Sequence, residues 1–556
     1  MKGKLVELRG GRVYDPTNGV NGEVRTLYLG PNGIVTAPTD PGAIGESHDL
    51  SGCVVMAGGI DIHTHIGGGK VNLARMMLTE DHRDHPVHRG CHPRMGGGRV
   101  TPSTYTVGYR YAEMGYTACF EPAMLLANAR QAHMEMADTP IVDKGAYVLL
   151  GNDDLLLTLM KDGADQRVIN DYVAWTITHS QALGLKVVNP GGINAFKYNQ
   201  RQLDLDEQNT AYGVTPRRIL TALASAVGEL GLAHPLHIHG CNLGVPGNVE
   251  TTLATIGALE GLRGHLTHIQ FHSYGTEGDR KFSSGAARIA EAINASPNVS
   301  VDVGQIMFGR TVTESGDSMR QYAGSAFADP KKWVGMDIEC DAGCGVVPFR
   351  YRNKNFVNAL QWAIGLELFL QVNDPWRIFL TTDHPNGAPF TSYPHLIRLL
   401  MDKSFRHDML ATLDPDAAAA TILASLDREY SLYEIAIMTR AAPARSLGLE
   451  GFGSLGLGAR AHVTVYREDE NREKMFATPA YVFKDGQLIV RDGRVLEEIH
   501  GATHAVHPDY DGAIERELDD YFTRYMTVRK DNQRVADDEI RDGGRGALVL
   551  HPVKPA

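Results

Sequence analysis

The sequence predicts an α/β protein: a (β/α)8 barrel that carries a β-sandwich domain built from both ends of the chain. In the middle of the chain, helical, alanine-rich segments alternate with apolar runs of strand character: YTACFEPAM, AYVLLGN, GLKVVNPGG, HPLHIHGCN, GHLTHIQFH, NVSVDVGQ and RIFLTTDH. Strands that alternate with helices form right-handed crossovers and a parallel sheet, and about eight such units close into a barrel. Short strands and turns without helices occupy the two flanks, so the flanks are expected to form a separate β domain.

Three segments follow from this pattern. Residues 1–55 contain short strands such as LVELRGGRVYD and EVRTLYLGPNGIV, and residues 450–500 contain similar strands joined by KDG and RDG turns. These two flanks are expected to form the composite β-sandwich domain, and residues 56–449 the barrel. Residues 501–556 form a C-terminal helical extension, whose one amphipathic helix either docks on the barrel or on a partner, or frays as a tail.

Composition limits the classes of function. The 556 residues carry a formal net charge of -12, and this mildly acidic balance argues against a nucleic-acid partner. The six cysteines form no C-x-x-C pair, which predicts reduced thiols and a cytoplasmic location; Cys340 and Cys344 lack the second pair that a metal finger needs. The N-terminus does not read as a signal peptide, and no apolar stretch reaches the roughly 18 residues of a membrane span.

The stretch MAGGIDIHTHIGG places His63 and His65 one residue apart at the end of an apolar run. Residues i and i+2 of a strand point to the same face, so these two imidazoles lie side by side. Neighbouring imidazoles suit a metal ion. The alternative is a polar strand end with two hydrogen-bonded histidines.

Other polar residues stand at or near the carboxyl ends of later strands, which is the end where parallel barrels assemble active sites. They are Lys186, His237 and His239, His268 and His272, and Asp383. Histidine nitrogens and carboxylate oxygens are zinc ligands, and together these residues fit a two-metal hydrolase site.

Longer blocks carry a more specific resemblance. VVMAGGIDIHTHIGGGKVN, PSTYTVGYRYAEMGYT, GLKVVNPGG, HIHGCNLGVPGNVETTLAT, HLTHIQFHSYG and LTTDHPNGAPF resemble the A subunits of formylmethanofuran dehydrogenase and of the bacterial formyltransferase/hydrolase complex, over about residues 5–500. These proteins belong to the amidohydrolase superfamily, whose TIM-type barrel and metal chemistry are therefore expected here.

The resemblance implies a set of metal ligands for two Zn²⁺ ions. In this superfamily the first strand provides His-x-His, the fourth a carboxylated lysine, the fifth and sixth one histidine each, and the eighth an aspartate. That order implies the following ligands here: His63, His65, Lys186 as N6-carboxylysine, His237, His272 and Asp383.

Three of these choices have rivals. GLKVVNPGG resembles the lysine-bearing strand of ureases, which favours Lys186 over Lys197 in NAFKYN. Relatives tend to use the first histidine of the strand-five pair, which favours His237 and leaves His239 to steady the substrate oxyanion. FHSYG resembles the urease stretch FHTEG, which favours His272 over His268.

Asp383 is predicted to be catalytic as well as a ligand. Amide cleavage requires that the departing amine be protonated, and an aspartate at the metal site can take a proton from the attacking water and pass it to nitrogen. The alternative role for Asp383 is a helix N-cap before HPNG.

A histidine-rich loop, EDHRDHPVHRGCHP, has two interpretations. Its histidines His82, His85, His88 and His92 could form a third metal site. Their irregular spacing and the interleaved Arg83, Arg89 and Arg94 favour a substrate-channel or subunit-facing loop. Arg83 and Arg89, with Asn242, are the predicted substrate-binding residues, since arginines suit the anionic, glutamate-bearing tail of a furan carrier.

The predicted reaction is metal-dependent hydrolysis of an N-formyl group on a furan carrier, methanofuran or methylofuran, to formate and the free amine, or the reverse condensation. The alternatives are a cyclic amidohydrolase of the hydantoinase or dihydropyrimidinase type, and a scaffold subunit without catalysis. The resemblance implies partner subunits, either of a formylmethanofuran dehydrogenase or of a formyltransferase/hydrolase complex. The chain has no cysteine motif for an iron–sulfur cluster, so redox chemistry would belong to other subunits.

Overall fold

The computed structural model describes residues 4–38, 41–77, 104–198, 200, 203–314, 324–329, 334–335, 345–541 and 546–554. At its centre lies a parallel barrel whose strands follow chain order: β6 (Gly59–Asp61), β7 (Tyr116–Met124), β8 (Asp143–Leu149), β9 (Gly184–Val188), β10 (Leu236–His239), β11 (Gly264–Leu266), β14 (Val299–Asp302) and β18 (Ile378–Phe379). The barrel closes where Thr64 bridges His384 in parallel and the His65 amide donates to the His384 carbonyl at 2.8 Å. The predicted (β/α)8 barrel is confirmed.

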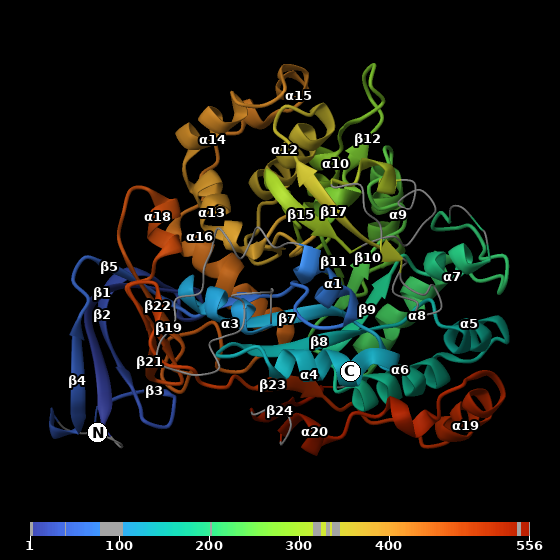
Figure 1. The fold of residues 1–556 in the computed structure, drawn as a ribbon, viewed down its shortest axis with the longest axis horizontal. Coiled ribbons are helices and arrows are strands. Elements are labelled where there is room, and N and C mark those ends of the chain that lie inside the picture. The colour runs from blue at the N-terminus through green and yellow to red at the C-terminus, as the bar shows by residue number, and fades with distance from the viewer. Residues whose placement is uncertain are drawn as a thin grey trace.

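Helices cover the outside of the barrel (Figure 1). The main ones are α3 (Thr104–Glu113), α4 (Ala129–Ala137), α5 (Asp154–Lys161), α6 (Gln166–Ser180), α8 (Pro216–Glu229), α9 (Val249–Ala258), α10 (Ala286–Ala295), α12 (Phe356–Gln371) and α13 (Tyr393–Met401). Capping side chains fix where several begin: Asp165 accepts a hydrogen bond from the Val168 amide at 3.1 Å before α6. Thr215 accepts from the Arg218 amide at 3.3 Å before α8. These caps satisfy amides that the first helical turn leaves without partners.

Strands from both ends of the chain form one nine-stranded sheet, seen at the left of Figure 1. The N-terminal strands are β1 (Leu5–Asp15), β2 (Val20–Leu29), β3 (Val35–Thr36), β4 (Ile44–Asp49) and β5 (Cys53–Ala57); the C-terminal strands are β19 (Val463–Arg467), β20 (Tyr481–Lys484), β21 (Gln487–Arg491) and β22 (Arg494–Val495). The two sets join where β5 pairs antiparallel with β19. This sheet has its own apolar core, which includes Leu8, Val55, Val463 and Phe483.

The last part of the chain contributes more than the predicted helix. Helix α19 (Ile514–Tyr525) lies on α6, where the Trp175 indole donates to Glu515 at 3.1 Å. In addition, β23 (Thr503–Val506) pairs with the first residues of β8, and β24 (Leu548–His551) pairs with β23. The sequence did not predict these two strands, because each spans only four residues, too few for periodicity to separate strand from helix.

An insertion between β14 and α12 lies beside the carboxyl ends of the barrel strands. It contains β15 (Gly309–Thr313), β16 (Val334–Gly335) and β17 (Gly345–Tyr351), which form a three-stranded antiparallel sheet. Helix α1 (Gly69–Met77) packs on this sheet through Ala74, Val312 and Val346. Among the described helices, none combines the length and apolar character that crossing a membrane requires.

Candidate metal centre and active site

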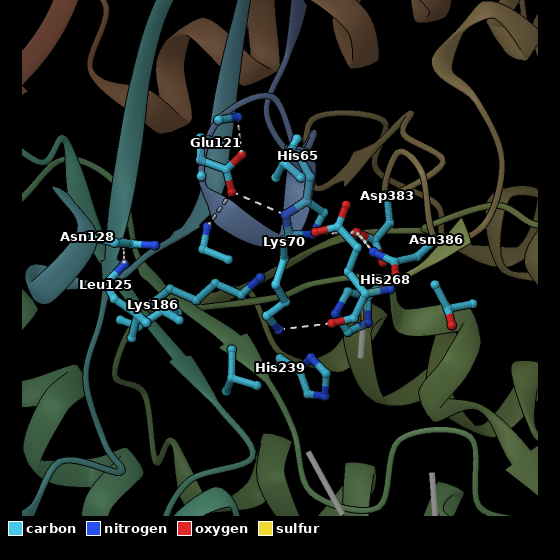
Figure 2. A pocket seen from close by; sticks show the side chains of 18 of the residues that line it. His65, Lys70, Glu121, Leu125, Asn128, Lys186, His239, His268, Asp383 and Asn386 are labelled. Atoms are coloured by element: carbon cyan, nitrogen blue, oxygen red, sulfur yellow. Dashed lines mark hydrogen bonds and ion pairs between the residues drawn. The ribbon is translucent and has the colours of Figure 1, made fainter. Parts of the chain in front are cut away.

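A cavity of about 300 Å³ opens at the carboxyl ends of the barrel strands. Figure 2 shows His65, Lys186, His239, His268 and Asp383 around this cavity. They come from the ends of β6, β9, β10, β11 and β18, so the barrel brings together residues that are far apart in the sequence. This is the end of the barrel at which the sequence predicted a site.

The first group of potential ligands comes from the two strands that close the barrel. Asp383 Oδ1 lies 2.9 Å from His63 Nε2 and 3.3 Å from His65 Nε2. The three side chains are buried and could hold one metal ion. Asp383 does not cap a helix: it has a left-handed backbone (φ 52°), accepts a hydrogen bond from Asn386 Nδ2 at 3.0 Å, and precedes η7 (Phe390–Ser392) by several residues.

The second group consists of His239, His268 and His272, whose nitrogens could hold another ion. The ring of His239 lies 4.6 Å from that of His268 and 5.5 Å from that of His272, centroid to centroid. Burial lowers the pKa of His268 and His272 well below its usual value, so both rings are neutral and offer lone pairs. Among the described residues, His268 Nδ1 and His272 Nε2 are buried without a hydrogen-bond partner.

Local backbone geometry presents His268 to the cavity. His268 has a left-handed conformation (φ 36°), and its amide donates to Asp302 Oδ1 at 2.7 Å. Gly304 lies against it, and a Cβ at this glycine would stand 2.3 Å from the His268 Cβ. The glycine after β14 therefore makes room for the histidine after β11.

His237 lies deeper, and both of its nitrogens have imidazole partners. His237 Nε2 is 2.9 Å from His63 Nδ1, and His237 Nδ1 is 3.0 Å from His234 Nε2. His237 could also hold an ion together with His63 and Asp302, but none of these three residues lines the cavity, whereas His239 does. The geometry therefore favours His239 as the strand-five ligand, with His237 supporting His63.

Glu121 and Asp302 belong to the site although the sequence analysis gave them no role. Glu121 Oε1 lies 3.1 Å from His65 Nδ1, and Glu121 Oε2 accepts hydrogen bonds from the amides of Ile66 at 2.6 Å and Gly67 at 3.1 Å. A carboxylate on Nδ1 fixes the tautomer and leaves Nε2 facing the cavity. Asp302 stands at the end of the strand-like run NVSVD, which is the signal that could have found it, whereas Glu121 lies inside the run YTACFEPAM and carries no such signal.

The site attracts positive charge. Burial alone would lower the pKa of His65, but the carboxylates of Glu121, Glu314 and Asp383 raise it to about 10. Burial likewise opposes ionisation of Asp383, yet His63, together with hydrogen bonds from His63 and His65, holds the pKa of this carboxyl well below its usual value. A proton therefore occupies the position where the carboxylates favour a cation.

Lys186 lines the cavity and Lys197 does not. Burial lowers the pKa of Lys186 to about 8, although Asp383 and Asp302 favour its ammonium form. Lys197 is half-buried at the end of α7 (Gly192–Lys197). The structure thus brings the favoured lysine, and not its rival, to the ligand groups.

The remaining predicted residues lie elsewhere. The side-chain Nδ2 of Asn242 donates to Asp204 and, at 3.2 Å, to Thr251. Asn242 does not line the cavity, although its neighbour Leu243 does. The histidine-rich loop with Arg83, Arg89 and Arg94 lies outside the described residues, as do Cys340 and Cys344.

Comparison with known proteins identifies the class. The sequence model of the amidohydrolase family matches residues 46–490. FhcA, from the formyltransferase/hydrolase complex Fhc of Methylorubrum extorquens, is 44% identical over 538 residues, covering 96% of this chain and 97% of the relative. Protein FwdA of Methanocaldococcus jannaschii is 40% identical over 555 residues, covering 96% of each. The chain is therefore a hydrolase of the amidohydrolase family.

The structural comparison narrows this class. An X-ray structure of the formyltransferase/hydrolase complex FhcABCD from Methylorubrum extorquens, in complex with methylofuran, contains a chain with 41% sequence identity and a TM-score of 0.92, covering 99% of this chain and 100% of that one. Within the amidohydrolases, the chain belongs to the family of FhcA and FwdA, which confirms the predicted resemblance.

Proposed function

We propose that this chain is the hydrolytic subunit that converts an N-formylated furan carrier and water to formate and the free aminomethylfuran, or catalyses the reverse condensation. The observation that carries the proposal is the convergence of Lys186, three histidines and Asp383 on one cavity, in a chain that shares its fold over its whole length with a methylofuran-bound complex. Amidohydrolase chemistry matches the cleavage of a formamide C–N bond.

The donor set fits two metal ions, and we take zinc as the metal. His63, His65 and Asp383 would hold one ion, and His239 with His268 or His272 the other. Imidazole nitrogens and carboxylate oxygens are ligands that zinc prefers. Among the described residues, His268 Nδ1 and His272 Nε2 are buried without hydrogen-bond partners, which is expected of ligand nitrogens that a metal ion would satisfy.

Lys186 is proposed to complete the centre as N6-carboxylysine. Only a neutral amine adds carbon dioxide, and the pKa of about 8 makes the neutral form accessible near neutral pH. The carbamate carries the negative charge that a ligand between two cations needs. When bound, the ions would polarise the formyl oxygen and lower the pKa of the attacking water.

Asp383 moves the proton. Its carboxylate is ionised in the folded protein, so it can accept a proton from the attacking water. It then donates that proton to the nitrogen, which lets the amine leave. Asn386 Nδ2 holds one oxygen of this carboxylate at 3.0 Å, and His63 and His65 face the same oxygen, so the group is fixed in position.

The carrier and the partners follow from the relatives. We propose methylofuran or methanofuran as the carrier and the other subunits of a formyltransferase/hydrolase or formylmethanofuran dehydrogenase complex as partners. Arg83 and Arg89 remain predicted contacts for an anionic carrier tail. The reducing cytoplasm remains the location predicted from the cysteine pattern.

An assay with paired substrates tests the proposal. The purified chain, with any subunits that accompany it, is supplied with N-formylfurfurylamine or with the cyclic amides hydantoin and dihydrouracil, and metal content is measured by inductively coupled plasma analysis. We expect release of formate from the formylated amine and no ring opening. Ring opening alone would support a cyclic amidohydrolase, and active protein without metal would refute the mechanism.

A further inference from the structure

Glu314 places a second carboxyl group in the active-site cavity. It directly follows β15, in the insertion beside the barrel mouth, and is only 5% exposed. Its backbone is held on both sides: the Glu314 amide donates to Asn386 Oδ1 at 2.7 Å, and Lys70 Nζ donates to the Glu314 carbonyl at 2.9 Å. The backbone of Glu314 is therefore fixed at the cavity wall.

The carboxyl itself lacks a protein partner on one oxygen. Glu314 Oε1 is buried and accepts no hydrogen bond from any residue that the structure describes. A buried acceptor without a partner is destabilising, so such a group is retained where a ligand satisfies it. The cavity is the place from which that ligand would come.

Asn386 links the backbone of Glu314 to the catalytic carboxyl of Asp383. Its Oδ1 accepts from the Glu314 amide, and its Nδ2 donates to Asp383 Oδ1 at 3.0 Å. One side chain thus sets the positions of Glu314 and Asp383 relative to each other. Two carboxyl groups held together across a cavity suit a substrate atom that must exchange protons.

The charges around Glu314 indicate which part of the substrate its carboxyl group would face. The groups around it are His65, Glu121, Asp383 and Lys70; burial, with Glu121 and Asp383, raises the pKa of Glu314 to about 7, against the opposing effect of His65 and Lys70. A carboxyl in this setting repels formate, the anionic product. It attracts the nitrogen, which bears an N–H in the formamide and becomes an ammonium in the product.

We propose that Glu314 contacts the nitrogen of the scissile formamide, accepting its N–H hydrogen bond and holding the ammonium of the product amine. This rests on the proposed function. It gives the site two carboxyl groups with separate roles: Asp383 carries the proton, and Glu314 positions the nitrogen that receives it. The apolar side chains of Leu243 and Phe271 in the same cavity provide a surface for the rest of the amine.

The test measures the two products separately on the metal-loaded protein. Furfurylamine is the amine probe and formate the anion probe; each is titrated calorimetrically and tested as an inhibitor of N-formylfurfurylamine hydrolysis. In Glu314→Gln, which keeps the shape and removes the charge, we expect the dissociation constant of furfurylamine to rise at least tenfold. That of formate should change less than twofold.

Controls separate this role from a structural one. Glu250 on α9 forms an exposed ion pair with Arg288 on α10, and Glu250→Gln, which makes the same charge change, should leave both constants unaltered. Glu314→Asp, which keeps the charge on a shorter side chain, should bind furfurylamine with intermediate affinity. Metal content is measured in every variant.

Each result has a defined meaning. Unchanged furfurylamine binding in Glu314→Gln overturns the assignment, as does no furfurylamine binding by the wild type. Equal weakening of both probes together with metal loss also overturns it, because Glu314 would then support the metal centre. If the wild type binds furfurylamine through Glu314 but hydrolyses no formylated amine, the proposed reaction fails while the amine site stands.

Discussion

The two ends of the barrel bury charged groups in different ways. At the amino end of β8, Asp143 faces the Lys484 ammonium at 2.6 Å and accepts the Ala502 amide at 2.7 Å. At the carboxyl end, Asp383 faces His63 and His65, which are cations only when protonated. One end therefore neutralises its buried carboxylate with a lysine of the composite sheet, whereas the carboxylate at the other end faces two imidazoles with which it could hold a metal ion.

This difference separates a structural cluster from a functional one. Burial would raise the pKa of Asp143, but Lys484 lowers it, and the pair links the barrel to the composite sheet. At the mouth, the pKa of about 10 at His65 means that a proton substitutes for a cation that the carboxylates favour. A metal ion would displace that proton, so metal binding there releases protons.

The largest effect on turnover is expected from Asp383→Asn. An amide cannot accept and return a proton, so hydrolysis should fall by about 10²–10⁴-fold, the contribution usual for positioned proton transfer. Metal content should remain mostly intact, because the imidazoles stay in place. The measurement is kcat with inductively coupled plasma analysis on the same sample, and a near-normal rate would remove Asp383 from the proton-transfer role.

The strand-five pair provides the next test. His239→Asn should lose metal together with activity, because His239 faces the cavity. His237→Asn should keep its metal and lose about 10- to 100-fold in activity, the loss usual when a group supporting a ligand is removed. Metal content and kcat of the two variants measure this difference, and metal loss in His237→Asn alone would restore the assignment made from sequence.

This pair shows where sequence reasoning ends. The barrel was predictable because polar residues stand at the ends of alternating apolar runs, and the ends of parallel strands must meet. His237 and His239 share one face by periodicity, and only depth along the barrel axis separates them. That depth appears in the register, where His237 lies opposite Lys186 and His239 opposite Val188.

Other features carried too weak a signal or none. Glu121 is one carboxylate within a strand, and nothing local shows that it meets His65 Nδ1 across the barrel. Glu314 lies in an insertion whose position depends on contacts with Asn386 and Lys70, both far away in the sequence. Long-range contacts of this kind cannot be derived from the local pattern of one sequence.

The pH dependence of reactivation tests whether Lys186 at the barrel mouth forms the proposed carbamate. Its amine must be neutral to add carbon dioxide; with a pKa of about 8 the neutral fraction is about 1% at pH 6 and about half at pH 8. After removal of metal and carbon dioxide, reactivation by zinc and bicarbonate should therefore be roughly 50-fold faster at pH 8 than at pH 6. The measurement is the rate of recovered activity at a fixed concentration of dissolved carbon dioxide, and a rate independent of pH would contradict the carbamate.

The smallest effect on turnover, and a large one on stability, is expected at the other end of the barrel. Lys484→Met leaves Asp143 as a buried charge without its cation, which should reduce the free energy of unfolding by about 3–5 kcal/mol. As a control, Glu250→Gln in the exposed pair with Arg288 should reduce it by less than about 1 kcal/mol. Chemical denaturation measures both values. Because Lys484 lies at the end opposite the cavity, kcat per folded, metal-loaded molecule should not change. A fall in kcat without a fall in stability would mean that the two clusters are coupled through the barrel.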